Sequence, residues 1–271
     1  MYKNGIIALI NIILLINVQF AYSQDLILYH SNYEERIFKE LKNGKLTDTL
    51  GFMLASNVDF DAASKMMIEE QLMELIKPLV KRVEKEANSM RTLRKLNKTV
   101  ASNYLKNYEK LSDFSEIVTT GTYDCLTSTL LYAYLLEKLG YNYSIKETNY
   151  HIYLVVNLEN KDVLIEPTDP YYGFVWEKKY IEKRIANYRA DNIKGEDDFL
   201  ASLNLDKKIN LLQLASLQYY NIAVKQFNNR HYERAVNSVK KSMMIYDCER
   251  NRLLLDYSME FIPKLSSSTL K

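Results

Sequence analysis

Apolar residues in the middle of the chain change from a helical spacing to a strand-like spacing. Across residues 126–139, leucines recur at intervals of three and four, polar residues precede the run, and Gly140 follows it. These are start and stop signals of a helix. Three later segments are rich in valine, isoleucine, leucine and tyrosine: residues 141–148, 151–158 and 162–166. They predict strands, and the polar turn at residues 159–161 predicts a hairpin between the last two.

The region before this stretch has a helical pattern from residue 31 to about residue 112. Ser31, followed three residues later by Glu34, has the spacing of a capping box at a helix start. Residues 61–87 predict a long amphipathic helix with a kink at Pro78. The expected apolar face of this helix consists of Met66, Met67, Leu72, Leu75, Ile76 and Val80.

The region after the stretch predicts further helices. Residues 180–188 are helical in pattern, and the polar segment 189–198 that follows is the best domain boundary in the chain. Residues 209–228 and 232–246 predict two helices joined by a short polar turn. The residues around Ala223 and Ala235 resemble one tetratricopeptide repeat, in which small residues let paired helices approach closely. Since a single repeat cannot bury its own face, we expect the hairpin to dock on the rest of the chain, and binding of a protein partner is the alternative.

The first 23 residues have the layout of a secretory signal. Lys3 precedes an apolar run, and Ala21-Tyr22-Ser23 supplies small residues at a cleavage site. We expect an exported, periplasmic or secreted protein without a stable membrane anchor after cleavage; an uncleaved anchor is the alternative. The remaining chain divides into an N-terminal helical region (24–112), a central core (113–190) and a C-terminal helical region (199–271).

The composition of the chain argues against several classes of function. The chain has 271 residues, is 47% hydrophobic and carries a net charge of +2, which describes a globular protein with no strong attraction to nucleic acid. The basic residues between Arg82 and Lys98 are interrupted by acids and are typical of a solvated helix face. Two cysteines exclude a disulfide framework. Cys248, His231 and His30 lack metal-ligand spacing, so no metal or other cofactor is expected.

The candidate chemistry lies in the central stretch. Cys125 opens the predicted helix, where free N–H groups and the helix dipole favour a thiolate. His151 opens the second predicted strand and Glu166 closes the third. An imidazole can generate a thiolate, and an acid can orient the imidazole. The structural alternative is a buried apolar cysteine, a sheet histidine and an acid that caps a turn.

The order and flanks of these residues resemble the transglutaminase-like superfamily, whose fold is related to that of papain-like cysteine proteases. Three segments carry the resemblance: Asp124-Cys125 at the start of the helix, the strand from His151 to Val155, and Ile165-Glu166-Pro167-Thr168. The resemblance implies that Cys125 is the nucleophile and His151 its base. Glu166 occupies the position where the family usually has aspartate, and Asp169 is the alternative acid.

Together these observations predict an α+β fold that is mainly helical, with a small antiparallel sheet packed on the helix that carries Cys125 and with a helical C-terminal hairpin. The predicted function is a thiol enzyme, a cysteine protease, an amidase or an acyltransferase, that acts on a peptide or protein substrate through Cys125, His151 and Glu166. Hydrolysis and acyl transfer remain open, because both pass through the same acyl-enzyme. The alternative is a non-catalytic module of the same fold that binds peptides or proteins.

Overall fold

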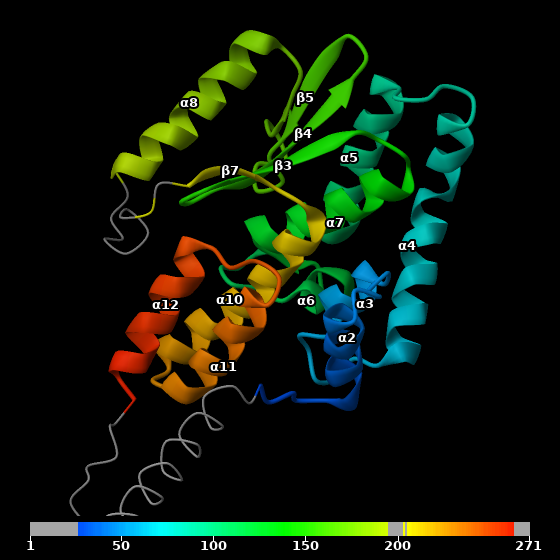
Figure 1. Ribbon diagram of the computed structural model, residues 1–271. Helices are drawn as coiled ribbons and strands as arrows, with labels where there is room; N and C mark the ends of the chain where they lie inside the picture. The colour runs from blue at the N-terminus through cyan, green and yellow to red at the C-terminus, as the bar shows by residue number, and fades with distance from the viewer. Residues whose placement is uncertain (1–26, 195–202, 204, 263–271) are drawn as a thin grey trace, which may run out of the picture.

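The computed structural model describes residues 27–194, 203 and 205–262. Within these residues it contains helices on both sides of one five-stranded antiparallel sheet and a separate two-stranded parallel pair (Figure 1). The helices before the sheet are α2 (Asn32–Lys42), α3 (Thr49–Leu54), α4 (Ala62–Val83), α5 (Met90–Tyr104), α6 (Phe114–Thr119) and α7 (Cys125–Lys138). The later helices are α8 (Lys178–Lys194), α10 (Leu211–Asn228), α11 (Tyr232–Met243) and α12 (Glu249–Glu260). The expected signal segment, residues 1–23, lies outside the described residues.

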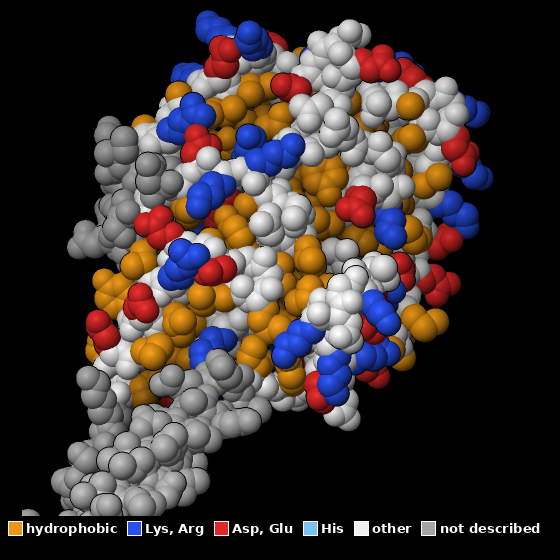
Figure 2. All heavy atoms as spheres, viewed as in Figure 1, with side chains coloured by type: hydrophobic (Ala, Val, Ile, Leu, Met, Phe, Trp, Pro, Cys, Tyr) orange, Lys and Arg blue, Asp and Glu red, His pale blue; other side chains and the backbone are white. Residues whose placement is uncertain are grey.

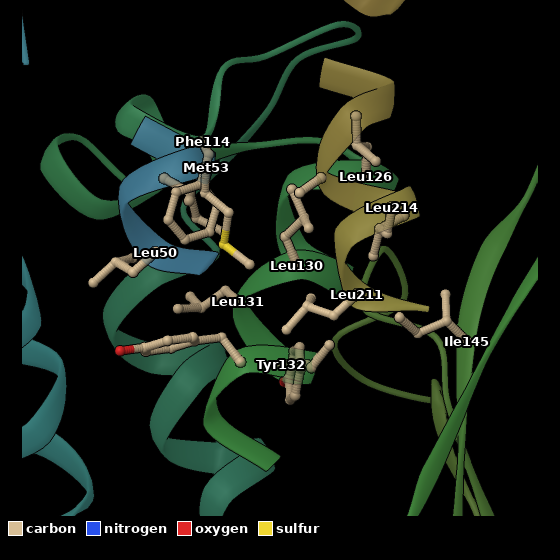
Figure 3. Packing of buried hydrophobic residues seen from close by; sticks show 14 of the residues in the cluster. Leu50, Met53, Phe114, Leu126, Leu130, Leu131, Tyr132, Ile145, Leu211 and Leu214 are labelled. Atoms are coloured by element: carbon tan, nitrogen blue, oxygen red, sulfur yellow. The ribbon is translucent and has the colours of Figure 1, made fainter. Parts of the chain in front are cut away.

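Helix α7 is the centre of the main core. Asp124 caps its start, and Gly140 follows its end with a φ of +71°, a conformation that glycine adopts without strain. The helix is apolar on nearly all sides, as expected of a helix surrounded by other elements. Figure 3 shows the side chains that meet there: Leu126, Leu130, Leu131 and Tyr132 of α7, Leu211 and Leu214 of α10, Leu50 and Met53 of α3, Phe114 of α6 and Ile145 of β3.

The five-stranded sheet has the order β6-β5-β4-β3-β7. Its strands are β3 (Tyr143–Thr148), β4 (Ile152–Leu158), β5 (Lys161–Ile165), β6 (Phe174–Val175) and β7 (Asp206–Ile209). The predicted β4–β5 hairpin is confirmed, with Leu158 paired to Lys161 across its turn. The pair β1 (Asn107–Tyr108) and β2 (Thr122–Tyr123) lies just before α7.

The two faces of the sheet pack on different helices. Ile152, Leu154 and Val156 belong to the main core with α7, whereas Tyr153 and Leu164 pack against α8. Figure 1 shows α8 on the side of the sheet opposite α7. The helix predicted over residues 180–188 is longer in the structure, because α8 continues to Lys194. The domain boundary predicted at residues 189–198 stays a prediction, and its later part lies outside the described residues.

Strand β7 was not expected, because it lies in a region predicted to be helical. It pairs with β3, so the C-terminal region contributes an edge strand to the central sheet before its helices begin. Three of its four residues are exposed, which is why no alternation of apolar and polar residues marks it in the sequence.

Helix α4 begins at the expected place and buries part of the expected face, with Leu72 and Ile76 in the core. Its core residues are Ile68, Leu72, Ile76 and Leu79, which form one helical stripe. Met66 and Met67, expected on that face, are 68% and 72% exposed. The prediction included apolar residues that flank the stripe. Packing against the neighbouring elements buries the stripe and leaves Met66 and Met67 exposed.

The C-terminal helices dock on the rest of the chain, as expected. Ala223 and Ala235 are fully buried between α10 and α11, and the Gln218 side chain bonds to backbone groups of Met53 and Phe114. Lys241 of α11 forms a buried ion pair with Glu34 at 2.8 Å and 2.9 Å. Helix α12, which packs on α11, was not predicted.

The predicted capping box of α2 is confirmed only on one side. The Ser31 side chain accepts the Glu34 N–H, but the Glu34 carboxylate is buried and accepts from His30 and Lys241 instead. Burial by itself would raise the pKa of Glu34, yet the bonds from His30 and Lys241 lower it overall. Glu34 therefore ties the N-terminal helix to the C-terminal hairpin.

The fold prediction is confirmed at the level of a mainly helical α+β protein with an antiparallel sheet and a helical C-terminal region. Figure 2 shows acidic and basic side chains interspersed over the visible face, with hydrophobic side chains between them. None of the helices in the described part of the chain is long and apolar enough to span a membrane.

Candidate functional site

Cys125 is the first residue of α7, directly after the N-cap Asp124. The Asp124 side chain accepts the Thr127 N–H at 2.8 Å, and the Thr127 hydroxyl accepts the Asp124 N–H at 2.9 Å. This reciprocal pair fixes the start of the helix. Asn221 of α10 donates to the second carboxylate oxygen of Asp124 at 3.3 Å. The position of Cys125 is therefore held by local capping and by the C-terminal region together.

The surroundings of the Cys125 thiol disfavour the thiolate. Burial raises its pKa above the ordinary value, and the charges of Asp124 and Glu166 raise it further, whereas Arg250 and the Leu126 N–H lower it. The expectation that the helix start favours a thiolate is thus wrong for the resting state, because desolvation outweighs the dipole. Burial likewise raises the pKa of Asp124 to about 6.

His151 lies in the turn between β3 and β4, one residue before β4 begins. Its backbone is held by Thr148: the His151 N–H donates to the Thr148 hydroxyl at 3.0 Å, and the Thr148 N–H donates to the His151 carbonyl at 2.9 Å. Its ring packs on the ring of Tyr188 from α8, with centroids 4.5 Å apart. Tyr188 also packs on Tyr153, at 4.9 Å.

Glu166 follows the last residue of β5 and is 4% exposed. Leu154 pairs with Ile165, so continuing the register by one residue brings Glu166 opposite Tyr153. Glu166 Oε1 accepts from the Thr168 hydroxyl at 2.6 Å. Glu166 Oε2 is buried and completes no hydrogen bond with the described residues. The Glu166 charge nevertheless contributes, after burial, to raising the pKa of Tyr188.

Asp169, the alternative acid, is engaged elsewhere. Its Oδ2 accepts from Arg184 of α8 at 2.7 Å, and its Oδ1 accepts the Tyr172 N–H at 2.9 Å. The loop that carries it closes on itself, because the Glu166 N–H donates to the Gly173 carbonyl at 2.9 Å. A Cβ on residue 173 would collide with the backbone carbonyl oxygens of Glu166 and Asp169, so this closure needs glycine. Asp169 is therefore committed to Arg184 and Tyr172, whereas Glu166 Oε2 completes no hydrogen bond with the described residues.

The three predicted residues come from adjacent elements that meet at one end of the sheet. His151 precedes β4 and Glu166 follows its antiparallel neighbour β5, so both lie at the same strand ends. The start of α7 reaches this end as well, since the hydroxyl of Thr129, one helical turn after Cys125, donates to the Ile152 carbonyl at 3.3 Å. The His151 ring packs on Tyr188 of α8, and Glu166 lies opposite Tyr153, which also packs on α8, whereas α7 packs on the opposite face of the sheet.

Arg250 of α12 holds the turn that carries His151, and the sequence analysis missed it. Its guanidinium donates to the carbonyls of Thr148 and Asn149, at 3.1 Å and 3.4 Å. Its Nε lies 3.2 Å from Glu147 Oε1, and the Tyr246 hydroxyl donates to Glu147 Oε2 at 2.8 Å. The only sequence signal was Glu147 itself, an acid that falls on the same strand face as the core residue Ile145.

No protein-family model, curated protein or solved structure matches this chain. The resemblance drawn from the residues around Cys125, His151 and Glu166 therefore remains a proposal. Within residues 27–194, 203 and 205–262, no three histidine, cysteine, aspartate or glutamate side chains are gathered so that they could hold a metal ion. The chemistry available at this site is that of a thiol, an imidazole and carboxylates.

Proposed function

We propose that this chain is an exported thiol enzyme with a transglutaminase-like core, which acts on amide or peptide bonds by hydrolysis or acyl transfer. The observation that carries the proposal is the meeting of three elements at one end of the sheet. These are the start of α7 with Cys125, the turn with His151, and the end of β5 with Glu166. A nucleophile, a base and an orienting acid are the groups that such a reaction needs.

In the proposed reaction the Cys125 sulfur attacks the carbonyl carbon of the substrate amide while His151 accepts the thiol proton. The backbone N–H of Cys125, at the free start of α7, is the natural donor to the oxyanion that forms. His151 then gives its proton to the departing amine as the carbon–nitrogen bond breaks, leaving a thioester on Cys125. Water or a second amine attacks this thioester, His151 removes the proton of the attacking group, and the thiolate leaves and is reprotonated.

The raised pKa of Cys125 sets the form of this mechanism. A thiol that is neutral at rest must lose its proton to His151 as it attacks, rather than wait as a preformed ion pair. Arg250, whose charge lowers the pKa of Cys125, opposes the effect of the two carboxylates.

Trapping of the acyl-enzyme tests the proposal. The mature chain is incubated with a set of glutamine-containing and asparagine-containing peptides, with hydroxylamine as the acceptor amine, and both the protein and the products are analysed by mass spectrometry. The proposal predicts an acyl adduct on Cys125 and release of either acid or hydroxamate, and neither in Cys125→Ala. Cys248, which is 4% exposed, serves as the internal control thiol. Identical products from the wild type and Cys125→Ala would refute it.

The second candidate function is a non-catalytic module that binds peptides or proteins. One observation favours it: the thiol is desolvated and faces two carboxylates, which is the environment of an inert cysteine. Under this alternative the C-terminal hairpin, or the surface around Cys125, would hold the partner. Peptide binding without any adduct on Cys125 would support it over the enzyme.

A further inference from the structure

A groove rich in aromatic side chains lies between α8 and the segment that leads into it. Its volume is about 680 Å³, within the range of small-molecule and peptide subsites. We call it the aromatic groove and define it by Tyr171, Tyr172, Phe174, Trp176, Tyr180 and Tyr188. Tyr171 and Tyr172 are 89% and 77% exposed. Rings exposed side by side on one surface are typical of a binding site rather than of packing.

The aromatic groove leads to the proposed catalytic residues through Tyr188. This residue lines the groove, is 7% exposed, and packs its ring on His151. Its buried hydroxyl completes no hydrogen bond of ordinary geometry within the described residues, although Glu166 and Arg184 lie close enough to affect its pKa. A buried hydroxyl without a partner costs free energy, and a polar group of a bound molecule would satisfy it.

A basic pocket adjoins the aromatic groove. It has a volume of about 880 Å³ and runs along α5, where Arg91, Arg94, Lys95 and Lys98 line it. Glu86 is the one acid among the described residues that line it. The two hollows meet where the Arg94 guanidinium lies over the Trp176 ring, 4.2 Å from its centroid. The basic residues that looked like a solvated helix face in the sequence thus form the charged extension of an aromatic surface.

We propose that the aromatic groove and the basic pocket together bind the part of a peptide substrate that flanks the reacting amide, with an apolar or aromatic side chain in the groove and acidic side chains along α5. The inference rests on the proposed function for the identity of the reacting group. The chemistry of the proposed peptide follows from the lining residues. The aromatic rings of the groove suit an apolar or aromatic side chain, and the excess of positive charge in the basic pocket suits acidic side chains. Tyr188 lines the groove and contacts His151.

The single tryptophan of the chain makes this testable without turnover, because Trp176 lies in the groove. The full mature chain carrying Cys125→Ala is titrated with three capped hexapeptides of equal length. The first contains one phenylalanine and two glutamates, the second replaces the glutamates by lysines, and the third replaces the phenylalanine by serine. Binding is followed by tryptophan fluorescence and, in parallel, by calorimetry, so that a silent binding event is not missed.

The proposal predicts that the first peptide binds about tenfold more tightly than either of the others, and that its advantage over the lysine peptide shrinks as salt rises. Arg91→Gln with Lys95→Gln should remove most of the charge preference, while the control pair Lys45→Gln with Lys225→Gln, exposed elsewhere, should leave it intact. Tyr171→Ala should weaken binding of the first peptide several-fold, and Met67→Ala, at a residue that is also exposed but lies on α4, should not.

Equal affinity for all three peptides, or no binding by either method, would overturn the inference. So would binding of an acidic oligosaccharide such as hexagalacturonate in place of the peptides, since the occupant would then be a glycan. These outcomes are separate from failure of the proposed reaction, which is read from acyl adducts on Cys125 in the wild type and does not depend on this peptide set.

Discussion

Asp124 caps the start of α7 and is also buried, and these two properties shift its pKa in opposite directions. Substitution by asparagine separates the two effects. A carboxylate at a helix N-cap is normally stabilised by the free N–H groups and the dipole, which lower its pKa. Here burial dominates, and the pKa of Asp124 rises from 3.8 to about 6. Asparagine keeps the capping oxygen that accepts from Thr127 but carries no charge to desolvate.

The magnitude follows from the linkage between protonation and folding. A carboxyl whose pKa is higher in the folded state stabilises the protein fully below its unfolded pKa, and this stabilisation is lost as the pH rises through the folded value. The shift for Asp124 is roughly two units, and each unit corresponds to about 1.4 kcal/mol, so the loss between pH 3 and pH 7 is about 3 kcal/mol. About half of it should occur by pH 5. The free energy of unfolding of Asp124→Asn should therefore increase relative to that of the wild type as the pH rises.

Urea unfolding of both proteins at a series of pH values between 3 and 7.5, followed by circular dichroism, measures this difference. Asp61→Asn is the matched control, because Asp61 is an exposed N-cap whose pKa is lowered by hydrogen bonds from Ser64. For this pair the difference in the free energy of unfolding should change in the opposite direction, so that the wild type becomes more stable relative to Asp61→Asn as the pH rises. If the wild type also gains on Asp124→Asn with rising pH, capping outweighs burial at Asp124, and the reasoning about the electrostatics beside Cys125 is wrong.

Three further substitutions test the contacts that position the site. Lys241→Met leaves the Glu34 carboxylate buried without its ion pair and should lower the free energy of unfolding by about 3–5 kcal/mol, most of which a second change, Glu34→Gln, should restore; an equal loss in the double variant would contradict this. Arg250→Gln removes the guanidinium that holds the turn before β4 and leaves Glu147 buried without its ion pair, so amide hydrogen exchange should accelerate more at His151 than in α10; equal acceleration at both places, or none at His151, would show that the turn does not depend on the guanidinium. Tyr188→Phe keeps the ring on His151 but removes a buried hydroxyl without a partner, so urea unfolding should show unchanged stability or a gain of about 1 kcal/mol, and a clear loss would mean that the hydroxyl is satisfied.

The parts of the fold that could be predicted are those encoded over short distances. The helix that begins at Cys125 has a cap at each end and an uninterrupted apolar run, and the β4–β5 hairpin has a polar turn between two strand-like segments. Such signals lie within one element and its flanking residues, so they do not depend on contacts with distant parts of the chain.

The parts that could not be predicted depend on distant partners. Strand β7 carries mostly exposed polar residues, and only its pairing with β3 makes it a strand. The predicted apolar face of α4 was too wide, because its sequence has more apolar positions than its neighbours cover. Arg250 donates a hydrogen bond to a turn 102 residues earlier in the chain. Local sequence patterns cannot predict a contact over this separation.

The candidate site shows the same division. The positions of Cys125 at a helix start and of His151 and Glu166 at adjacent strand ends follow from local patterns. The protonation state of the thiol does not, because it is set by burial and by carboxylates that the fold brings near it. Sequence reasoning from the helix dipole alone gave the wrong sign for the pKa of Cys125.

The central claim is that His151 serves Cys125 as a base, and the most direct measurement is the rate of iodoacetamide labelling of Cys125 against pH. Cys248→Ser, a conservative change at the N-cap of α12, removes the second thiol from the assay in both proteins. The account predicts that His151→Ala slows labelling near neutral pH by about a hundredfold, the usual scale of general-base assistance, and that the two rates converge in strong alkali. Superimposable rates across the whole pH range would contradict it and leave Cys125 as a packed thiol.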